Sequence, residues 1–403
     1  MKKLRSLPVL ALAAALAACS SPSGSSDPEP PVITITGVQE GGVYEGQATV
    51  GVSVDRGSYT ATLNGSAFAA GGVVGEPGAY VLKVDARNGI ATSTKTVNFS
   101  VRFAGNRLLI VRLFDLGDNE SGGGGDAILI TDSTGSGMRH GLIDAGPQGA
   151  NASNPGYVLQ RLQTLNITRL QFVQLTHAHA DHYAGMSQVL NGMTVDWFVY
   201  NGQQRANVSG YQTVLTAANN RADTVVVPTV VTDLPFGYET GLAKVVPPLP
   251  TYLNNSSASG DQLNEGSLGT SLRRGTFSMF FTGDGEVEAN TRWRTQYASL
   301  TANLKALKVG HHGANNAIFD NGFNGASSWL AHTQPELAVV SANGRSHPRI
   351  NALNALLGRT TMDTYCTSVH GDITIRIADT GQYAVTVQKN PNLACQPGTE
   401  ATT

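Results

Sequence analysis

Short apolar runs alternate with polar residues between positions 32 and 103. The runs VITITGV, ATVGVSV, SYTATLNG, AYVLKVDA and TKTVNFSV follow this pattern, and Gly, Asn and Asp stand between them. Alternation with a period of two is typical of half-buried β-strands, and the stretch has no helical period. The pattern predicts a small β-sandwich at residues 32–103.

The pattern changes after residue 107, where strand-like and helix-like segments follow one another. LLIVRLF, AILIT, GLIDAG and LQFVQL predict strands, whereas YVLQRLQTL has the spacing of an amphipathic helix. A Gly-rich segment, DLGDNESGGGGD, lies between the first two strands. Its spacing matches neither a Walker loop nor a dinucleotide-binding turn, so a loop insertion is the better interpretation and we expect no nucleotide cofactor.

The first residues form a targeting segment rather than part of a fold. Lys2, Lys3 and Arg5 precede an apolar run at 7–18, which is too short to span a bilayer. The run ends in LAAC, which resembles the cleavage site of bacterial lipoproteins, so we expect residues 1–18 to be removed and Cys19 to carry lipid. An ordinary signal peptide is the alternative. The Ser/Pro-rich segment 19–31 suits a flexible tether.

Composition fits an exported protein. The 403 residues include 27 Lys and Arg against 29 Asp and Glu, a formal net charge of -2, which argues against nucleic-acid binding by bulk charge. Charged residues make up 14% of the chain and glycines number 46, which is typical of a strand-rich, loop-rich protein. We expect a cell-envelope protein held outside the cytoplasm by lipid on Cys19, or a secreted one.

Two cysteines remain if Cys19 is acylated. Cys366 and Cys395 would form a disulfide in an oxidising compartment and tie the C-terminal tail to the body; two free thiols are the alternative. Neither cysteine has the spacing of a metal site.

The segment HAHADH, which follows the strand LQFVQL after Thr176, is the most specific indication of function in the sequence. His177 and His179 are two residues apart and point the same way on an extended chain, while Asp181 and His182 follow where a helix begins. Imidazole and carboxylate ligands suit zinc, or manganese and iron, better than calcium or magnesium. A loop of surface histidines is the alternative.

HAHADH matches the HxHxDH motif of the metallo-β-lactamase superfamily. GLIDAG resembles the superfamily's early Asp-bearing strand, and FSMFFTGD and LKVGHHG resemble its later motifs, all in the expected order. SANGRSHP and SVHGDITIRI resemble the metallo-β-lactamase-like domain of ComEC-type DNA-uptake proteins. The resemblance covers residues 107–388 and implies an α/β fold, an αββα sandwich, followed by a tail at 389–403. The segments ITGVQEGGVY, ATLNG and GAYVLKVDARNG resemble bacterial immunoglobulin-like modules.

The resemblance also implies a ligand set. Asp284, which ends FSMFFTGD, would bridge two metals, and one of His311 and His312 would be a ligand, with a preference for His311. His347 would lie at the active site, where it would bind substrate or protonate a leaving group.

One feature departs from many members of the superfamily, because no His occurs between Tyr183 and Gly283. We therefore expect two unequal sites, and the second to bind metal more tightly. The first would have His177, His179 and Asp284; the second would have Asp181, His182, Asp284 and His311 or His312. The gap in the first site would be lined by Asn264, Glu265 or Ser267, or filled by water.

These ligands predict a hydrolase that uses a metal-bound hydroxide, with one or two zinc ions, or manganese, and with Asp181 orienting the water. The ComEC-type motifs favour a phosphodiester substrate, with nucleic acid foremost. Another ester (a phosphocholine ester, a lactone or a thioester) and a non-catalytic surface binding protein are the alternatives. The arginines near the motifs would hold phosphate or lie on the surface: Arg273, Arg274, Arg345 and Arg349. The aromatic residues considered for a choline pocket or for the core are Trp197, Tyr200, Tyr211 and Trp293.

Overall fold

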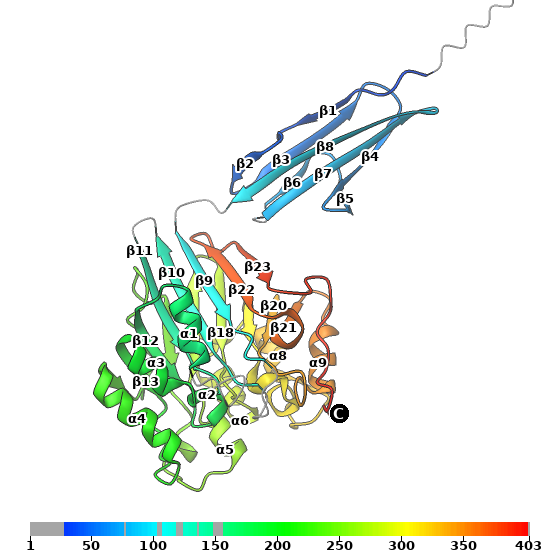
Figure 1. Ribbon diagram of the computed structural model, residues 1–403. Coiled ribbons are helices and arrows are strands. Elements are labelled where there is room, and N and C mark those ends of the chain that lie inside the picture. The colour runs from blue at the N-terminus through cyan, green and yellow to red at the C-terminus, as the bar shows by residue number, and fades with distance from the viewer. Residues whose placement is uncertain are drawn as a thin grey trace, which may run out of the picture. The chain divides into compact units, whose positions relative to one another are not determined.

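The computed structural model describes residues 28–75, 78–102, 107–117, 124–134, 137–147 and 156–401 (Figure 1). The predicted signal peptide and Cys19 lie outside these residues. The chain divides into two compact units: one holds the residues up to Gly42 with Ala48–Val74 and Ala79–Ser100, and the other holds Val43–Gln47, Gly75–Gly78 and Val101–Thr403. Within the described residues, no helix is long and apolar enough to cross a membrane.

The described residues between 28 and 102 form two sheets of β-strands, as the alternating pattern predicted. A three-stranded sheet has the order β1 (Ile33–Thr36), β3 (Ala48–Val54), β6 (Gly72–Val74). A five-stranded sheet has the order β2 (Gly42–Glu45), β8 (Ala91–Arg102), β7 (Gly78–Asn88), β4 (Ser58–Leu63), β5 (Ser66–Ala67). Alternate residues such as Leu82, Val84 and Phe99 are buried, because successive side chains of a strand face opposite sides. The likeness to an immunoglobulin module stays a prediction.

The larger unit contains two mixed sheets. The eight-stranded sheet has the order β14 (Ala222–Val226), β13 (Thr194–Tyr200), β12 (Arg169–Leu175), β11 (Gly137–Ile143), β10 (Ile128–Thr134), β9 (Leu108–Leu113), β22 (Ile373–Ala378), β23 (Tyr383–Val387). The seven-stranded sheet has the order β15 (Thr232–Asp233), β16 (Ala243–Val246), β17 (Gly269–Arg274), β18 (Phe277–Phe281), β19 (Ala306–Lys308), β20 (Leu337–Val340), β21 (Asp363–Cys366).

The two sheets pack face to face through one apolar core. Val111 and Leu113 of the eight-stranded sheet belong to the same buried cluster as Leu272, Met279 and Phe281 of the seven-stranded sheet. Along β9 the burial alternates residue by residue, and the fully buried positions are Leu109, Val111 and Leu113.

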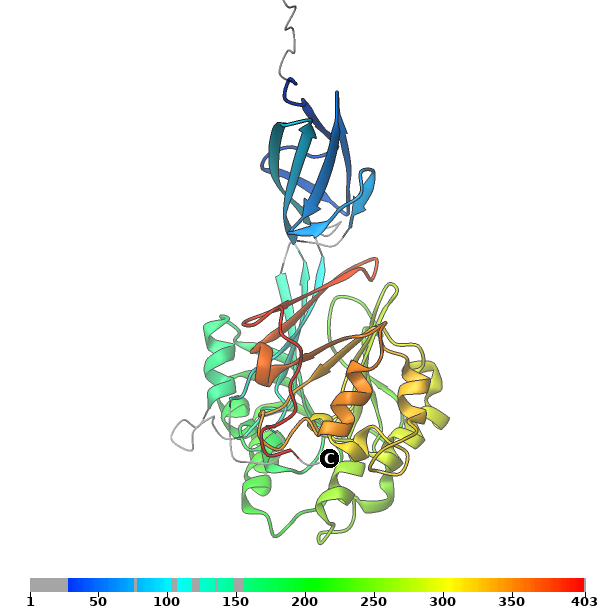
Figure 2. The same cartoon turned by 90° about the vertical axis from the view of Figure 1, so that its right-hand side faces the viewer.

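Helices cover the outer faces of both sheets (Figures 1 and 2). The helices against the eight-stranded sheet are α1 (Tyr157–Thr164), α2 (Ala180–Tyr183), α3 (Met186–Gly192) and α4 (Ser209–Arg221). Those against the seven-stranded sheet include α6 (Val287–Gln296), α8 (Ser328–Thr333) and α9 (Ile350–Leu357). The short elements between them are η1 (Pro250–Tyr252), α5 (Gly260–Glu265), α7 (Ala298–Thr301), η2 (Gly310–Gly313), η3 (Asn315–Ala317) and α10 (Thr367–His370). These layers, helix, sheet, sheet, helix, are consistent with the predicted metallo-β-lactamase fold.

The sheet topology brings the predicted motifs to one edge. β11 and β12 run parallel, and so do β18, β19 and β20. The carboxyl ends of parallel strands meet at the same edge of a sheet, and this is where α/β proteins place their sites. The HAHADH, TGD, GHHG and SANGRSHP segments follow the carboxyl ends of these strands, and GLIDAG ends β11 with Asp144 just beyond it.

A disulfide joins the C-terminal tail to the seven-stranded sheet. Cys366, the last residue of β21, is bonded to Cys395, with 5.6 Å between their Cα atoms. The structure therefore contains the predicted bond rather than two free thiols.

Candidate metal centre

The HAHADH segment leaves β12 and turns into α2. His179 has an extended backbone (φ -97°, ψ 147°) and stands just before the helix, which begins at Ala180. The turn brings His177, Asp181 and His182 inward, and both histidines are fully buried.

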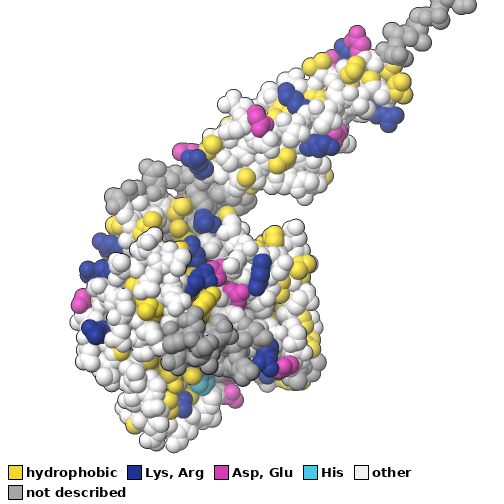
Figure 3. Space-filling model, viewed as in Figure 1, with side chains coloured by type: hydrophobic (Ala, Val, Ile, Leu, Met, Phe, Trp, Pro, Cys, Tyr) yellow, Lys and Arg dark blue, Asp and Glu magenta, His cyan; other side chains and the backbone are white. Residues whose placement is uncertain are grey.

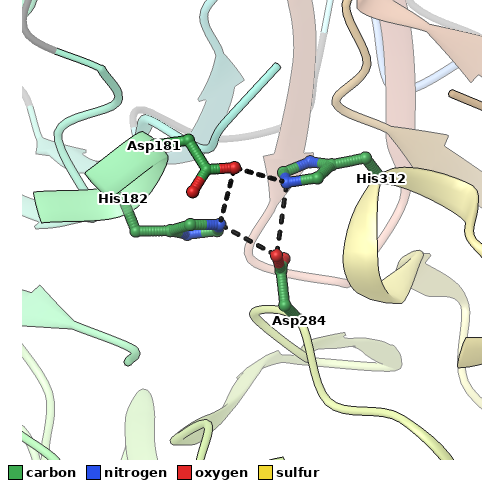
Figure 4. A group of neighbouring side chains, drawn as sticks. All are labelled: Asp181, His182, Asp284 and His312. Atoms are coloured by element: carbon green, nitrogen blue, oxygen red, sulfur yellow. Dashed lines mark hydrogen bonds and ion pairs between the residues drawn. The ribbon is translucent and has the colours of Figure 1, made fainter. Parts of the chain in front are cut away.

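Four side chains from three separate segments converge beside this turn. Asp181, His182, Asp284 and His312 each offer one ligand atom, and these atoms lie within 4.8 Å of one another (Figure 4). His182 Nε2 is 3.1 Å from Asp284 Oδ2, and His312 Nε2 is 3.3 Å from that same oxygen. His312 Nε2 is also 3.4 Å from Asp181 Oδ2. Two imidazoles and two carboxylates thus point at one small space.

A second group shares one member with the first. His177, His179 and Asp284 also offer ligand atoms within 4.8 Å of one another. His177 Nε2 lies 2.9 Å from His179 Nδ1 and 3.8 Å from Asp284 Oδ2. Asp284 therefore belongs to both groups, one of four residues and the other of three.

His182 is fixed from behind by a buried carboxylate. Asp144 Oδ2 lies 2.7 Å from His182 Nδ1 and accepts a hydrogen bond from Thr176 Oγ1, while Asp144 Oδ1 accepts one from Thr176 N. The carbonyl of Ser341 holds His312 in the same way, 2.9 Å from its Nδ1. Partners of this kind leave Nε2 free for a metal and fix the ring orientation.

The pairing of Asp126 with Lys308 is a feature that sequence reasoning missed. Lys308 is fully buried, forms an ion pair with Asp126, donates a hydrogen bond to the Gly283 carbonyl and lies 3.9 Å from Asp284 Oδ1. The sequence offered one indication of this pair, a lysine between the apolar residues of LKV. A charge is rarely buried in a strand without a partner of opposite charge. The pair supports the segment that carries Asp284.

His311 and His312, of which the sequence analysis preferred His311 as the ligand, lie in different surroundings. Both residues have left-handed backbones, with φ of 43° and 52°, and this turn sends their rings in different directions. His312 joins the group of four. His311 instead contacts the buried Glu286, at 2.7 Å between Nδ1 and Oε1.

His347 lies beside these two histidines. Its ring centroid is 5.4 Å from that of His311 and 6.1 Å from that of His312, and its Nδ1 is 3.0 Å from Ser346 Oγ. Burial, followed by the charges of His312 and His311, lowers the pKa of His347 to about 3. A neutral imidazole suits substrate binding better than proton donation.

The residues proposed to line the gap in the first site take part in hydrogen bonds with neighbouring segments. The carboxylate of Glu265 accepts hydrogen bonds from the backbone N–H groups of Glu288 and Ala289, at the start of α6. Asn264 Nδ2 donates to Glu286. Ser267 Oγ accepts a hydrogen bond from the N–H of Asp284 and so helps to fix the backbone at that residue.

Most of the arginine and aromatic candidates are in structural positions. Arg274 is 3% exposed and forms an ion pair with Asp132, so it is not available to phosphate as we had considered. Arg273 donates to the Ser299 carbonyl. Tyr211 and Trp293 are buried in the two helix-facing cores and are not part of a choline pocket.

The donor set fits a divalent transition metal. Among the described residues, His312 Nε2 and Asp284 Oδ1 are buried side-chain atoms without a hydrogen-bond partner. Burial opposes ionisation of Asp284, but His182 and His312 hold its pKa well below the usual value. Burial likewise lowers the pKa of His312, but Asp284 and Asp181 outweigh it and raise that pKa to about 9. A buried site that keeps carboxylates ionised next to imidazole nitrogens suits a bound cation.

No protein-family model and no curated protein matches the sequence. Solved structures resemble parts of the chain. A mutant of the β-hydroxylase CmlA is 16% identical over 67% of this chain and 54% of its own, with a TM-score of 0.40; this chain thus spans about half of that protein. A diphosphatase of the PhnP family is 13% identical over 67% of this chain and 98% of its own (TM-score 0.36). The dizinc quorum-quenching lactonase AidC is 12% identical over 59% of this chain and 89% of its own (TM-score 0.30).

Proposed function

We propose that this protein is a metal-dependent hydrolase of the metallo-β-lactamase type. The observation that carries the proposal is the buried Asp284, which belongs to two groups of ligand atoms at once. A non-catalytic binding protein is disfavoured, because a retired site tends to lose ligands and both groups are complete enough to hold an ion.

A bound divalent ion would supply Lewis acidity and would acidify a water molecule. Around it, each side chain has a separate task. Asp181, 8% exposed, is in position to orient the attacking water. Asp144 and the Ser341 carbonyl keep Nε2 of His182 and His312 aimed at the centre. His347 lines the same site and would contact the substrate.

Zinc is the proposed metal, with manganese as an alternative. The group of Asp181, His182, Asp284 and His312 supplies four ligands, whereas the group of His177, His179 and Asp284 supplies three. More ligands with fixed orientation bind a metal more tightly, so the group of four should fill first.

A phosphodiester is the proposed substrate, on the strength of the ComEC-type motifs. On the face shown in Figure 3, Lys and Arg side chains are scattered and interspersed with acidic ones. With a net charge of -2 this distribution favours short or single-stranded substrates over tight duplex binding. Another ester, such as a lactone or a phosphocholine ester, is the second candidate.

A substrate panel with and without chelator tests the proposal. Single- and double-stranded DNA, RNA, a bis-aryl phosphate, a phosphocholine ester and a lactone are offered to the purified protein and to the Asp284→Ala variant. His332→Ala is the matched control, since His332 contacts Thr301 away from the ligand groups. The proposal is supported if the wild type and His332→Ala both cleave a phosphodiester, if the chelator stops this cleavage, and if Asp284→Ala does not cleave the phosphodiester. Cleavage that continues in the presence of chelator and in the Asp284→Ala variant would refute the proposal.

A lipid anchor on Cys19 remains a proposal from the sequence, because that residue lies outside the described part of the chain. Cys19→Ser should release the protein from the membrane fraction, and unchanged fractionation would exclude the anchor.

A further inference from the structure

We propose that the C-terminal tail, held by the Cys366–Cys395 disulfide, positions the loop that carries His347 beside the candidate metal centre. The tail consists here of residues 395–401, and the His347 loop of residues 341–348. The inference rests on the proposed function, because it assigns the tail a part in the same site.

The tail binds the His347 loop through consecutive backbone groups. The N–H groups of Gly398, Thr399 and Glu400 donate to the carbonyls of Pro348, Gly344 and Arg345, at 3.0, 2.8 and 2.8 Å. These acceptors flank His347 on both sides in the sequence. The side chains of Arg345 and Glu400 add an ion pair of 3.0 Å. The tail therefore holds the loop as an extra strand would.

The contact is too close to admit a side chain at residue 398. Gly398 is buried, and a Cβ atom there would lie 2.2 Å from the Arg345 carbonyl oxygen and 2.9 Å from the His347 nitrogen. Both neighbours are backbone atoms, which cannot move aside as a flexible side chain can. The tail thus depends on a glycine where it touches the loop of His347.

The disulfide sets where this contact occurs. Cys366 stands opposite Val340 in the parallel pairing of β20 and β21, and the His347 loop starts at the residue after Val340. Thr367 Oγ1 also exchanges hydrogen bonds with the backbone of Ala342. Cys395 lies only three residues before Gly398, so the bond brings the tail to the loop that leaves the adjacent strand. A crosslink at this place reduces the freedom of the tail.

Gly398→Ala and the double variant Cys366→Ser/Cys395→Ser test the inference by separate routes. The matched control is Gln396→Ala, since Gln396 is an exposed residue of the same tail whose side chain bonds only to Ala394 among the contacts described. Hydrogen exchange of the backbone N–H groups at 344–347 and 398–400 is measured first, because it needs no substrate. We expect faster exchange in both test variants and no change in the control.

Kinetics with the best substrate of the panel then separate positioning from general stability. We expect kcat/KM to fall about tenfold to a hundredfold in both test variants, with unchanged metal content. In a His347→Ala background, the same changes should cost nothing further, because the tail acts through His347. A purely structural tail would instead lower Tm and give additive losses in that background.

Each result decides one of the two proposals. Unchanged exchange at 344–347 in both test variants would overturn the inference, and so would faster exchange with unaltered kcat/KM. A wild-type protein that binds metal but cleaves nothing in the panel would overturn the proposed function instead, and the exchange rates would still show whether the tail holds the loop. If one test variant fails to fold, the other carries the test.

Discussion

Replacing Asp144 with asparagine should weaken metal binding without removing any ligand. The carboxylate of Asp144 accepts two hydrogen bonds from Thr176 and lies 2.7 Å from His182 Nδ1, with His182 fully buried. Asparagine keeps one oxygen, but its NH₂ group takes the place of the other and must face either Thr176, which donates hydrogen bonds here, or His182. If that group faces His182, the imidazole must place its proton on Nε2, which is the atom aimed at the metal.

The magnitude follows from the usual effect of such partners. Loss of a group that orients a metal ligand weakens affinity about tenfold to a hundredfold, or about 1.4–2.7 kcal/mol. Titration of the apoprotein with Zn²⁺ against a competing chelator measures this change directly. Asp132→Asn is the matched control, because Asp132 is an equally buried carboxylate that binds Arg107 and Arg274 instead of a ligand.

The two variants separate affinity from stability. Asp132→Asn should lower the free energy of unfolding and leave zinc affinity unchanged. Zinc affinity equal to wild type in Asp144→Asn would refute the idea that this carboxylate orients His182 for a metal.

Three further outcomes are expected. Asp284→Ala should lower the metal-to-chain ratio at both groups and abolish hydrolysis, as measured by metal analysis and activity; a full complement of metal would contradict the bridging place of Asp284. Lys308→Met should lower the free energy of unfolding by about 3–5 kcal/mol in urea titrations, because it leaves the buried Asp126 without its cation; a change below about 1 kcal/mol would mean that the pair is not buried as described. Burial raises the pKa of Glu265 from 4.5 to about 7, so the folded state binds this proton more tightly than the unfolded state. The contribution of Glu265 to the free energy of unfolding should therefore be greatest below pH 4.5 and should fall by up to about 3 kcal/mol as the pH rises to 7. The Glu265→Gln variant should not show this fall. Parallel curves of stability against pH for the variant and the wild type would contradict the assignment.

The chain's local patterns predicted several of the strands and helices and named the candidate ligands. β12 and α1 lie where apolar alternation and helical spacing placed them, at 169–175 and 157–164. The spacing of HAHADH was enough to expect His177 and His179 on one side and Asp181 and His182 in a turn, because these residues are neighbours in sequence. Local geometry follows from local residue order.

Contacts between distant segments needed the folded chain. Arg274 looked available for phosphate beside its motif, yet β17 carries it to a buried ion pair with Asp132. Lys308 and Asp126 are separated by 182 positions and meet in the interior. No local pattern states which distant charge neutralises a buried one.

The sequence by itself determined the kinds of ligand atoms, their order along the chain and the alternation of strands and helices. Only the tertiary structure decided that His312 rather than His311 faces Asp284, and that the tail crosses the His347 loop. The physical reason is that each outcome depends on a direction in space. Consecutive left-handed residues set the directions of the two histidines, and a disulfide with three backbone hydrogen bonds sets the path of the tail.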